Sequence, residues 1–199
     1  MLATAGQGRE DTTAPTRVEP SLDHLSGFTL YKEPLTMPKI YLSIGSNCDK
    51  EIHVPSALRR LQTLFGTLQV SALYESDAVG CSGPVFHNLV VGFWSELPAD
   101  VIVATLAEVE TLEGRTREPG QEVSHTLDLD LLLYGDAIID RGKVRVPRID
   151  ITRYAFVLAP LAELAPDDIH PLTGQSYASL WNQFDTATVR QTRMGPVSF

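Results

Sequence analysis

Apolar residues recur along the chain with two different periods, which predict an alternation of strands and helices. The segment KIYLSIG, at 39–45, is rich in β-branched and aromatic residues and ends in a Gly-Ser-Asn turn, so it predicts a strand. A helical period follows, which predicts an amphipathic helix over 54–66. The apolar positions with this spacing are Leu58, Leu61, Leu64, Phe65 and Leu68.

Two further strands and a second helix are predicted in the middle of the chain. TLQVSALYESDAV (67–79) and VFHNLVVGFWS (85–95) are strand-like and are separated by the loop GCSGP. Pro98 suits the first turn of a helix that ends at Gly114. The side chains that this helix is expected to bury are Ile102, Leu106 and Val109, with Leu112 as a further candidate near its end.

A polar loop, RTREPGQEVSH, leads into a predicted strand over 126–134. A short hairpin or β-arm is expected over 136–150, then a helix over 151–164 and a partly irregular C-terminal stretch. The order strand-helix-strand-strand-helix-strand is that of the ferredoxin-like split βαβ arrangement. We therefore predict an α+β fold, a ferredoxin-like βαββαβ sandwich with an added β-arm and a C-terminal helix.

The N-terminal part differs in composition from the rest. Residues 1–37 contain much Thr, Pro, Gly, Glu and Asp without a sustained apolar period, which predicts a disordered extension before a single domain at 38–199. Met37 directly precedes the first strand, so a start at Met37 is an alternative explanation of the extension.

Composition limits the possible partners. The net charge of -9 argues against binding to nucleic acid or to an anionic membrane. No run approaches the ~20 apolar residues of a membrane span, and the N-terminus lacks a secretory signal, so a cytoplasmic protein is expected. Cys48 and Cys81 occur in no paired motif, which favours free thiols over a disulfide.

The strand HTLDLDLLLYG, at 125–135, carries two aspartates in an apolar run. Asp128 and Asp130 are two residues apart, so both point to the same face of a strand. Two adjacent carboxylates repel each other, and a divalent cation between them would remove that cost. A solvated strand face is the alternative, and the short D-x-D spacing leaves both possibilities open.

Basic side chains near these aspartates suggest an anionic ligand. Arg115 and Arg117 follow the second predicted helix, whereas Lys143, Arg145 and Arg148 lie on or beside the β-arm. Arginine forks bind phosphate oxygens, and metal with arginine is the usual apparatus of phosphoryl transfer. Each basic residue alone is better explained as a solvated surface charge, and only convergence of these residues on the aspartates would make them functional.

Four more residues are candidates on local grounds. Glu110 precedes the arginine loop, where an exposed helix carboxylate is the simplest interpretation. Asn88 lies in an apolar strand, so its amide needs a backbone partner or a ligand. Phe86 and Phe156 either belong to the core or stack on a flat heterocycle.

Several segments together resemble the 6-hydroxymethyl-7,8-dihydropterin pyrophosphokinase family, over roughly residues 38–170. The matching segments are YLSIGSN, FHNLVV, EGRTR, TLDLDLLLYG and VPRID with AFVLAPLAELAP. The resemblance implies a ferredoxin-like enzyme of folate biosynthesis that transfers diphosphate from ATP to the pterin alcohol and releases AMP.

The resemblance also implies roles for individual residues. Asp128 and Asp130 would hold two Mg²⁺ ions that bridge the phosphates of ATP, the co-substrate. Catalytic roles would fall on these aspartates with Arg115 and His125. The nucleotide would be bound by Glu110, Arg115, Arg117, Lys143 and Arg148. The pterin would be bound by Ser76, Val79, Phe86, Asn88 and Phe156.

The chain also departs from the family pattern around the phosphates and the pterin. His125 stands where the family has a phosphate-contacting arginine, and Glu122 matches a tryptophan that closes over the site. Tyr154 replaces a mobile arginine, Arg148 replaces a histidine, and Asp77 replaces a proline. Because neutral histidine is a weaker partner for polyphosphate than arginine, these changes put turnover in question.

Three functions therefore remain open from the sequence. The first is an active Mg²⁺-dependent pterin diphosphokinase that works as a monomer on ATP and hydroxymethyldihydropterin. The second is a divergent, weakly active or inactive module that binds pterin or nucleotide. The third is another two-metal phosphoryl-transfer enzyme such as a nuclease, which the acidic charge disfavours.

Overall fold

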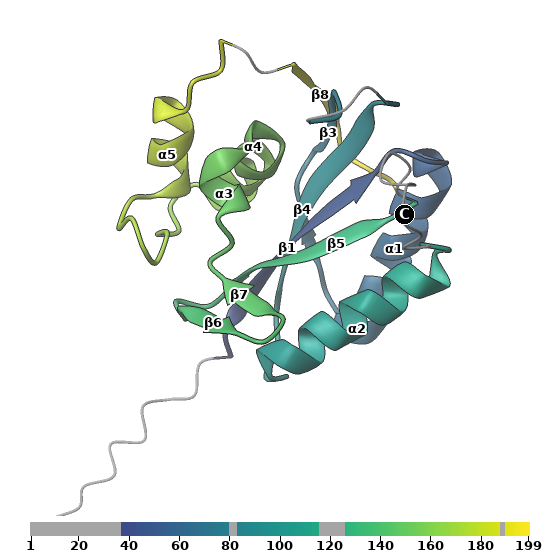
Figure 1. Ribbon diagram of the computed structural model, residues 1–199, viewed down its shortest axis with the longest axis horizontal. Helices are drawn as coiled ribbons and strands as arrows, with labels where there is room; N and C mark the ends of the chain where they lie inside the picture. Colours follow the sequence, from purple (N-terminus) through teal and green to yellow (C-terminus); the bar gives the residue numbers. More distant parts are fainter. Residues whose placement is uncertain (1–36, 80–82, 116–125, 188–189) are drawn as a thin grey trace, which may run out of the picture. The chain divides into compact units, whose positions relative to one another are not determined.

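An antiparallel sheet forms the centre of the part of the chain that this computed structural model describes, residues 37–79, 83–115, 126–187 and 190–199 (Figure 1). Its strand order is β5-β1-β4-β3-β8, and the short β2 pairs with β4. The first four strands in this order are those of the ferredoxin-like sandwich, so the predicted fold class is confirmed. The sheet strands are β1 (Lys39–Ser46), β2 (Gln69–Val70), β3 (Leu73–Ser76), β4 (Phe86–Trp94), β5 (Asp128–Tyr134) and β8 (Gln191–Gly195).

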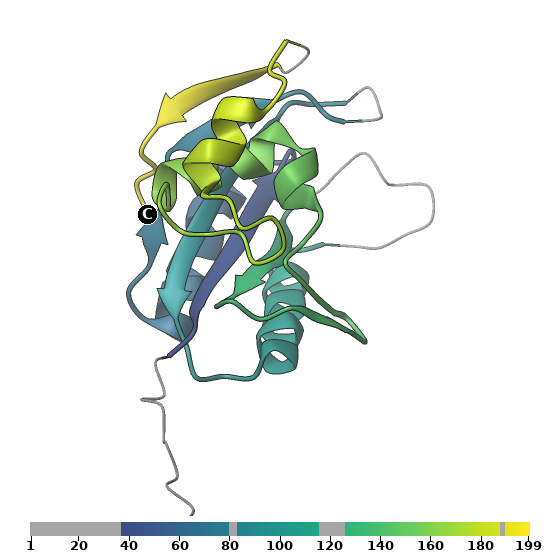
Figure 2. The same ribbon diagram turned by 90° about the vertical axis from the view of Figure 1, so that its left-hand side faces the viewer.

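Helices cover both faces of this sheet (Figures 1 and 2). Two long helices pack on one face and three shorter ones lie over the other, while a two-stranded hairpin forms the predicted β-arm. The first pair is α1 (Lys50–Phe65) and α2 (Ala99–Leu112). The other helices are α3 (Asp150–Arg153), α4 (Ala155–Leu164) and α5 (Tyr177–Gln183). The β-arm consists of β6 (Ile139–Arg141) and β7 (Val144–Val146).

Alternation along β1 divides the core between the two faces. Leu42 and Ile44 are fully buried beneath α1 and α2, whereas Tyr41 is buried beneath α4 and α5. The neighbouring residues Ser43 and Gly45 are only partly buried and line a cavity on the α4 side. The period of two therefore places small residues of the central strand opposite α4, where space remains.

A bulge in β5 explains its three consecutive leucines. Tyr41 pairs with Leu133 and Leu42 pairs with Leu131, which leaves Leu132 as the additional residue. Leu131 belongs to the core beneath α1 and α2, whereas Leu132 and Leu133 belong to the core beneath α4. The bulge thus lets an uninterrupted apolar run serve both faces of the sheet.

Two predicted elements are interrupted in the structure. The strand expected over 67–79 is divided into β2 and β3, because the register with β4 shifts by one residue between Val70, which pairs with Val91, and Tyr74, which pairs with Asn88. The helix expected over 151–164 is divided into α3 and α4 at Tyr154, whose φ of -122° and ψ of 127° are extended.

The remaining differences concern the ends of elements. Helix α1 begins at Lys50, four residues before the predicted start at residue 54. The sequence pattern missed this first turn because it is largely polar and because Pro55, which favours a helix start, lies inside the helix. Strand β8 was not predicted, since it is an edge strand whose Thr192, Arg193 and Met194 are exposed. The predicted extension over 1–37 lies outside the described residues except for Met37 and stays a prediction.

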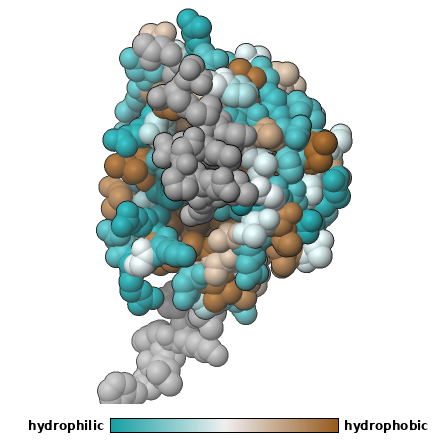
Figure 3. All heavy atoms as spheres, turned by 45° about the vertical axis from the view of Figure 1, so that its right-hand side comes forward, coloured by the Kyte–Doolittle hydropathy of each residue, from teal (hydrophilic) through white to brown (hydrophobic). Residues whose placement is uncertain are grey.

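Hydrophobic residues on the face seen in Figure 3 form scattered patches among hydrophilic ones. Exposed apolar side chains on the two long helices include Ile52, Leu64 and Leu112. The expected burial of Leu112 is therefore wrong, because the last turn of α2 presents this side chain to solvent. Single exposed apolar residues of this kind are normal for globular proteins. Among the described residues, no helix combines the length and apolar character that crossing a membrane requires.

Candidate active site

A cavity of about 240 Å³ lies between the sheet and the start of α4. Its residues come from β1, β4, β5 and the segment that follows the β-arm, so the antiparallel topology brings together distant parts of the chain. The lining consists of Ser43, Ile44, Gly45, Asn88, Asp128, Asp130, Arg148, Asp150, Tyr154, Phe156 and Val157.

Strand register places the two best polar candidates in one row across the sheet. Gly45 pairs with Asp128 on one side and with Asn88 on the other. A Cβ atom added at Gly45 would lie 3.4 Å from Asn88 Oδ1 and 3.9 Å from Asp128 Cβ. The absence of a side chain at Gly45 therefore leaves open the space between the carboxylate of Asp128 and the amide of Asn88.

Both aspartates of β5 point into this cavity, as their spacing predicts. Leu127, Leu129 and Leu131 are buried beneath α1 and α2, while Asp128 and Asp130 keep 42% and 31% of their side chains exposed. The carboxylates are thus held on a rigid strand but remain accessible to a ligand.

Arginines from two different elements neutralise these carboxylates. Arg115 Nη1 contacts Asp128 Oδ1 and Glu110 Oε1, and Arg148 Nη1 lies 3.0 Å from Asp130 Oδ1. Burial opposes the charge on each guanidinium, but the neighbouring carboxylates outweigh it and raise the pKa of both arginines. Each aspartate therefore has a permanently charged partner at the edge of the cavity.

Asp130 is the carboxylate that the site perturbs most. Burial, followed by the charge of Asp128, raises the pKa of Asp130 to about 6, and the charge of Arg148 only partly opposes this shift. A dication beside the pair would supply the missing positive charge. The electrostatics of this strand face thus favour a cation near Asp130.

Mg²⁺ fits this donor set in a specific way. Among the residues that the structure describes, no group of three or more acidic, His or Cys side chains could hold a metal ion. Mg²⁺ in nucleotide enzymes is commonly bound by one or two carboxylates together with substrate phosphates and water. Asp128 and Asp130 match that requirement and would leave the remaining positions to a phosphorylated ligand.

Glu110 has a different environment from the one its sequence position suggests. It is only 4% exposed, and its Oε1 accepts hydrogen bonds from the Leu129 backbone N–H at 2.9 Å and from Arg115. The expectation of an exposed helix carboxylate is therefore wrong. Glu110 ties α2 to β5 and orients the guanidinium of Arg115.

An amide and aromatic rings form the other half of the cavity. Asn88 is 6% exposed, and its Nδ2 donates to Ser76 Oγ at 2.9 Å. That bond leaves Asn88 Oδ1 directed toward the open space at Gly45. Phe156 stacks on Tyr154 with ring centroids 5.1 Å apart and planes inclined by 15°. These groups could read the polar edge and cover the face of a flat heterocycle.

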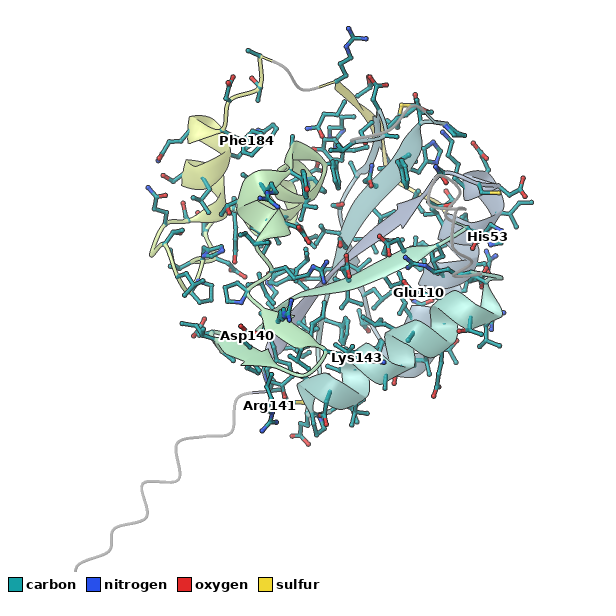
Figure 4. All side chains as sticks on the ribbon, in the orientation of Figure 1. His53, Glu110, Asp140, Arg141, Lys143 and Phe184 are labelled. Carbon is teal, nitrogen blue, oxygen red and sulfur yellow. The ribbon has the colours of Figure 1, made fainter. Side chains whose placement is uncertain are left out.

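The other predicted residues lie around this centre or outside the described chain. Phe86 Cδ1 lies 3.9 Å from the Cβ position of Gly45, whereas Val79 is 60% exposed. Lys143, labelled in Figure 4, lies in the turn between β6 and β7; it is exposed and is not among the cavity residues. Arg117 and His125, like Glu122, lie outside the described residues, so the structure does not place them.

Sequence reasoning missed two polar members of the site. Asp150 Oδ2 accepts from Arg148 Nε at 2.8 Å, and Ser43 lies in register with Asp130. The spacing of two residues in PRID could have indicated the first contact. Ser43 gave no signal, because a small polar residue in a central strand is common.

The fold and the known relatives together define the class of this protein, which is a transferase of the diphosphokinase type on a ferredoxin-like sheet. The chain belongs to the 7,8-dihydro-6-hydroxymethylpterin-pyrophosphokinase family, whose model matches residues 41–166. The family expected from the sequence is thereby confirmed, and with it an enzyme of folate biosynthesis.

Individual relatives agree with this assignment. The 2-amino-4-hydroxy-6-hydroxymethyldihydropteridine pyrophosphokinase of Pseudomonas aeruginosa is 37% identical over 134 residues, which cover 65% of this chain and 82% of that protein. The Haemophilus influenzae protein of the same name is 32% identical over 148 residues, or 72% of this chain and 91% of the relative.

A solved structure with a similar fold is the wild-type HPPK-DHPS of Plasmodium falciparum with pteroate. Its TM-score is 0.59 at 13% identity, and the match covers 74% of this chain. This chain spans 42% of the length of that protein, so the similarity concerns one part of it and shows the fold alone.

Proposed function

We propose that this chain transfers a diphosphate group from ATP to 6-hydroxymethyl-7,8-dihydropterin and releases AMP, with two Mg²⁺ ions. The observation that carries the proposal is the row of Asp128, Gly45 and Asn88 across the sheet. In this row, a carboxylate that could bind Mg²⁺ and an amide that could bind a heterocycle lie on either side of the open space at Gly45. A single cavity can then hold both reacting groups at once.

The phosphate half of the site would consist of the two β5 carboxylates and the arginines beside them. Asp128 and Asp130 would hold Mg²⁺, which when bound supplies positive charge to the phosphates. Arg115 and Arg148 each present a fork beside one aspartate and would contact phosphate oxygens. We assign ATP contacts also to Arg117, His125 and Lys143, as the family resemblance implies, and an orienting role to Glu110.

The pterin half of the site would use the buried amide and the aromatic rings. Asn88 Oδ1 would accept from an N–H group of the heterocycle, because one N–H of Nδ2 donates to Ser76 and Oδ1 faces the open space at Gly45. Phe156 would stack on the ring from the α4 side, backed by Tyr154, and Phe86 would cover the opposite side. Val79 would contribute from the loop that precedes β4.

The transfer itself forms one bond and breaks one. The hydroxymethyl oxygen attacks the β-phosphorus of ATP, the bond from that phosphorus to the bridging oxygen breaks, and AMP leaves with that oxygen. The proton of the hydroxymethyl group is released to solvent or to a neighbouring base. The chain contributes orientation and fixed positive charge near the phosphates, which is the usual basis of phosphoryl-transfer catalysis.

The test is incubation of the full chain with ATP, Mg²⁺ and hydroxymethyldihydropterin, with AMP measured over time. Wild-type protein should release AMP only when all three are present, and Asp128→Asn and Asp130→Asn should each lower the rate at least a hundredfold. Asp140→Asn on the exposed β-arm is the matched control and should keep the wild-type rate. Absence of AMP above a sample without protein would remove the proposal.

A binding module without efficient turnover is the second candidate. The observation in its favour is Tyr154, which occupies the place of a family arginine and stacks on Phe156. Calorimetry that detects pterin or nucleotide binding in a protein without turnover would support this function. Restored AMP release in His125→Arg would then locate the loss in the loop before β5.

We also propose that the chain acts as a cytoplasmic monomer. Size-exclusion chromatography with light scattering tests the oligomeric state directly. A mass twice the 21.8 kDa of the chain would contradict the monomer.

A further inference from the structure

A second buried carboxylate, Glu113, lies in the turn that follows α2. It is 7% exposed and contacts three side chains of α1. Ser56 Oγ donates to it at 2.7 Å and Arg60 Nε at 2.6 Å, while His53 Nδ1 lies 2.9 Å from its other oxygen. We call these four residues the Glu113 cluster; Figure 4 labels His53 on α1.

The Glu113 cluster is adjacent to the arginine that contacts Asp128. Gly114, with a φ of 81°, is the single residue between Glu113 and Arg115. The backbone N–H of Arg115 donates to the Glu110 carbonyl at 3.0 Å. The turn therefore has two attachments, because Glu110 holds the amide and the guanidinium of Arg115 while Glu113 holds the turn to α1.

Glu113 is charged at neutral pH. Burial opposes ionisation, but the hydrogen bonds from His53, Ser56 and Arg60, with the charge of Arg60, more than compensate, so the pKa of Glu113 lies below its ordinary value. A buried charge with three partners fixes its surroundings more firmly than an apolar contact would. The three partners all come from α1, so the position of the turn depends on the position of α1.

None of the four cluster residues lines the cavity. A direct contact between Glu113 and a ligand in the cavity is therefore not part of its role. Its nearest functional neighbour is Arg115, whose guanidinium reaches the cavity edge through Asp128. A displacement of about 1 Å in such a group can cost a hundredfold in rate.

We infer that Glu113 is a positioning residue, which through its contacts with α1 sets the place from which Arg115 reaches the nucleotide phosphates. The inference rests on the proposed function, in which Arg115 contacts ATP. It adds a role for α1, a helix that contributes no residue to the cavity.

The test is a double-mutant cycle of Glu113 and Arg115, in which the affinity for a nucleotide analogue is measured for each variant. Calorimetry with Mg²⁺ and α,β-methylene-ATP, a non-transferable analogue, should show about a ten- to hundredfold loss of affinity in Glu113→Ala and a smaller loss in Glu113→Gln. In an Arg115→Met background, Glu113→Ala should cost less than about threefold, since the group through which it acts is gone.

A matched control separates positioning from general stability. Glu163 on α4 is also a hydrogen-bonded carboxylate, with Tyr74 Oη at 2.8 Å and Arg193 Nη2 at 2.8 Å, but it contacts neither α1 nor Arg115 in these bonds and does not line the cavity. Glu163→Ala also removes a carboxylate with two hydrogen-bond partners, and it should leave analogue affinity within threefold of wild type. Circular dichroism confirms that each variant is folded before titration.

An equal loss of affinity from Glu113→Ala in the wild-type and Arg115→Met backgrounds would overturn the inference. The same holds if Glu163→Ala weakens the analogue as much as Glu113→Ala. A wild-type chain that binds the analogue without releasing AMP refutes the proposed transfer but leaves this test decisive. A wild-type chain that does not bind the analogue refutes both.

Discussion

Removal of the Glu110 carboxylate should lower the free energy of unfolding and should also leave Arg115 without one of its two ion-pair partners. In Glu110→Ala the buried N–H of Leu129 loses its acceptor at 2.9 Å, which costs about 1–3 kcal/mol. Arg115 also loses one of its two carboxylates, and breaking a buried ion pair commonly costs about 3–5 kcal/mol. Because both effects come from one oxygen atom, they overlap, and we expect about 3–5 kcal/mol in total.

Urea unfolding followed by tryptophan fluorescence measures this loss. Glu110→Gln retains an acceptor for Leu129 and should lose about 1–3 kcal/mol. Glu108→Ala, an exposed carboxylate on the same helix, should change the free energy of unfolding by less than about 0.5 kcal/mol. If Glu110→Ala lost under 1 kcal/mol, Glu110 would not be the link between α2 and β5 that its contacts indicate.

Two further predictions concern the cavity. Asn88→Leu replaces a buried amide by a group without hydrogen bonds, so it should weaken pterin binding at least tenfold in calorimetry. The affinity for α,β-methylene-ATP should stay nearly unchanged. Equal losses for both ligands would contradict the assignment of Asn88 to the pterin half of the site. Burial raises the pKa of Asp130 to about 6 from an ordinary value of 3.8, so the folded protein holds this proton more tightly than the unfolded chain does. In metal-free buffer, the stability that the neutral form contributes is therefore present below about pH 4 and is lost as the pH rises to about 6 and above. Asp130→Asn should therefore be more stabilising relative to wild type at pH 7.5 than at pH 4.5 in urea unfolding, and a difference independent of pH would show that the pKa is unperturbed.

Much of the fold could be predicted because its sequence signals are local. The period of two in HTLDLDLLLYG placed Asp128 and Asp130 on one face and the intervening leucines in the core, as the structure shows. β8 could not be predicted, because its exposed side chains carry no apolar period and its only specification is pairing with β3. The break at Tyr154 also leaves no periodic signal.

The candidate site was less predictable, because contacts across the sheet depend on register. No spacing in the sequence relates Gly45 to both Asn88 and Asp128, although they form one row. Burial of Glu110 was likewise hidden, since its acceptor role depends on how α2 packs against β5. Residue types predicted the chemistry, and topology decided which residues meet.

The central claim is transfer of the terminal diphosphate of ATP to the pterin alcohol. Phosphorus NMR of the full chain with ATP, Mg²⁺ and hydroxymethyldihydropterin tests it most directly, because it identifies every phosphorylated product. We predict equal amounts of AMP and a pterin diphosphate, since attack occurs at the β-phosphorus. Formation of ADP with a pterin monophosphate, or ATP that stays intact, would contradict the account.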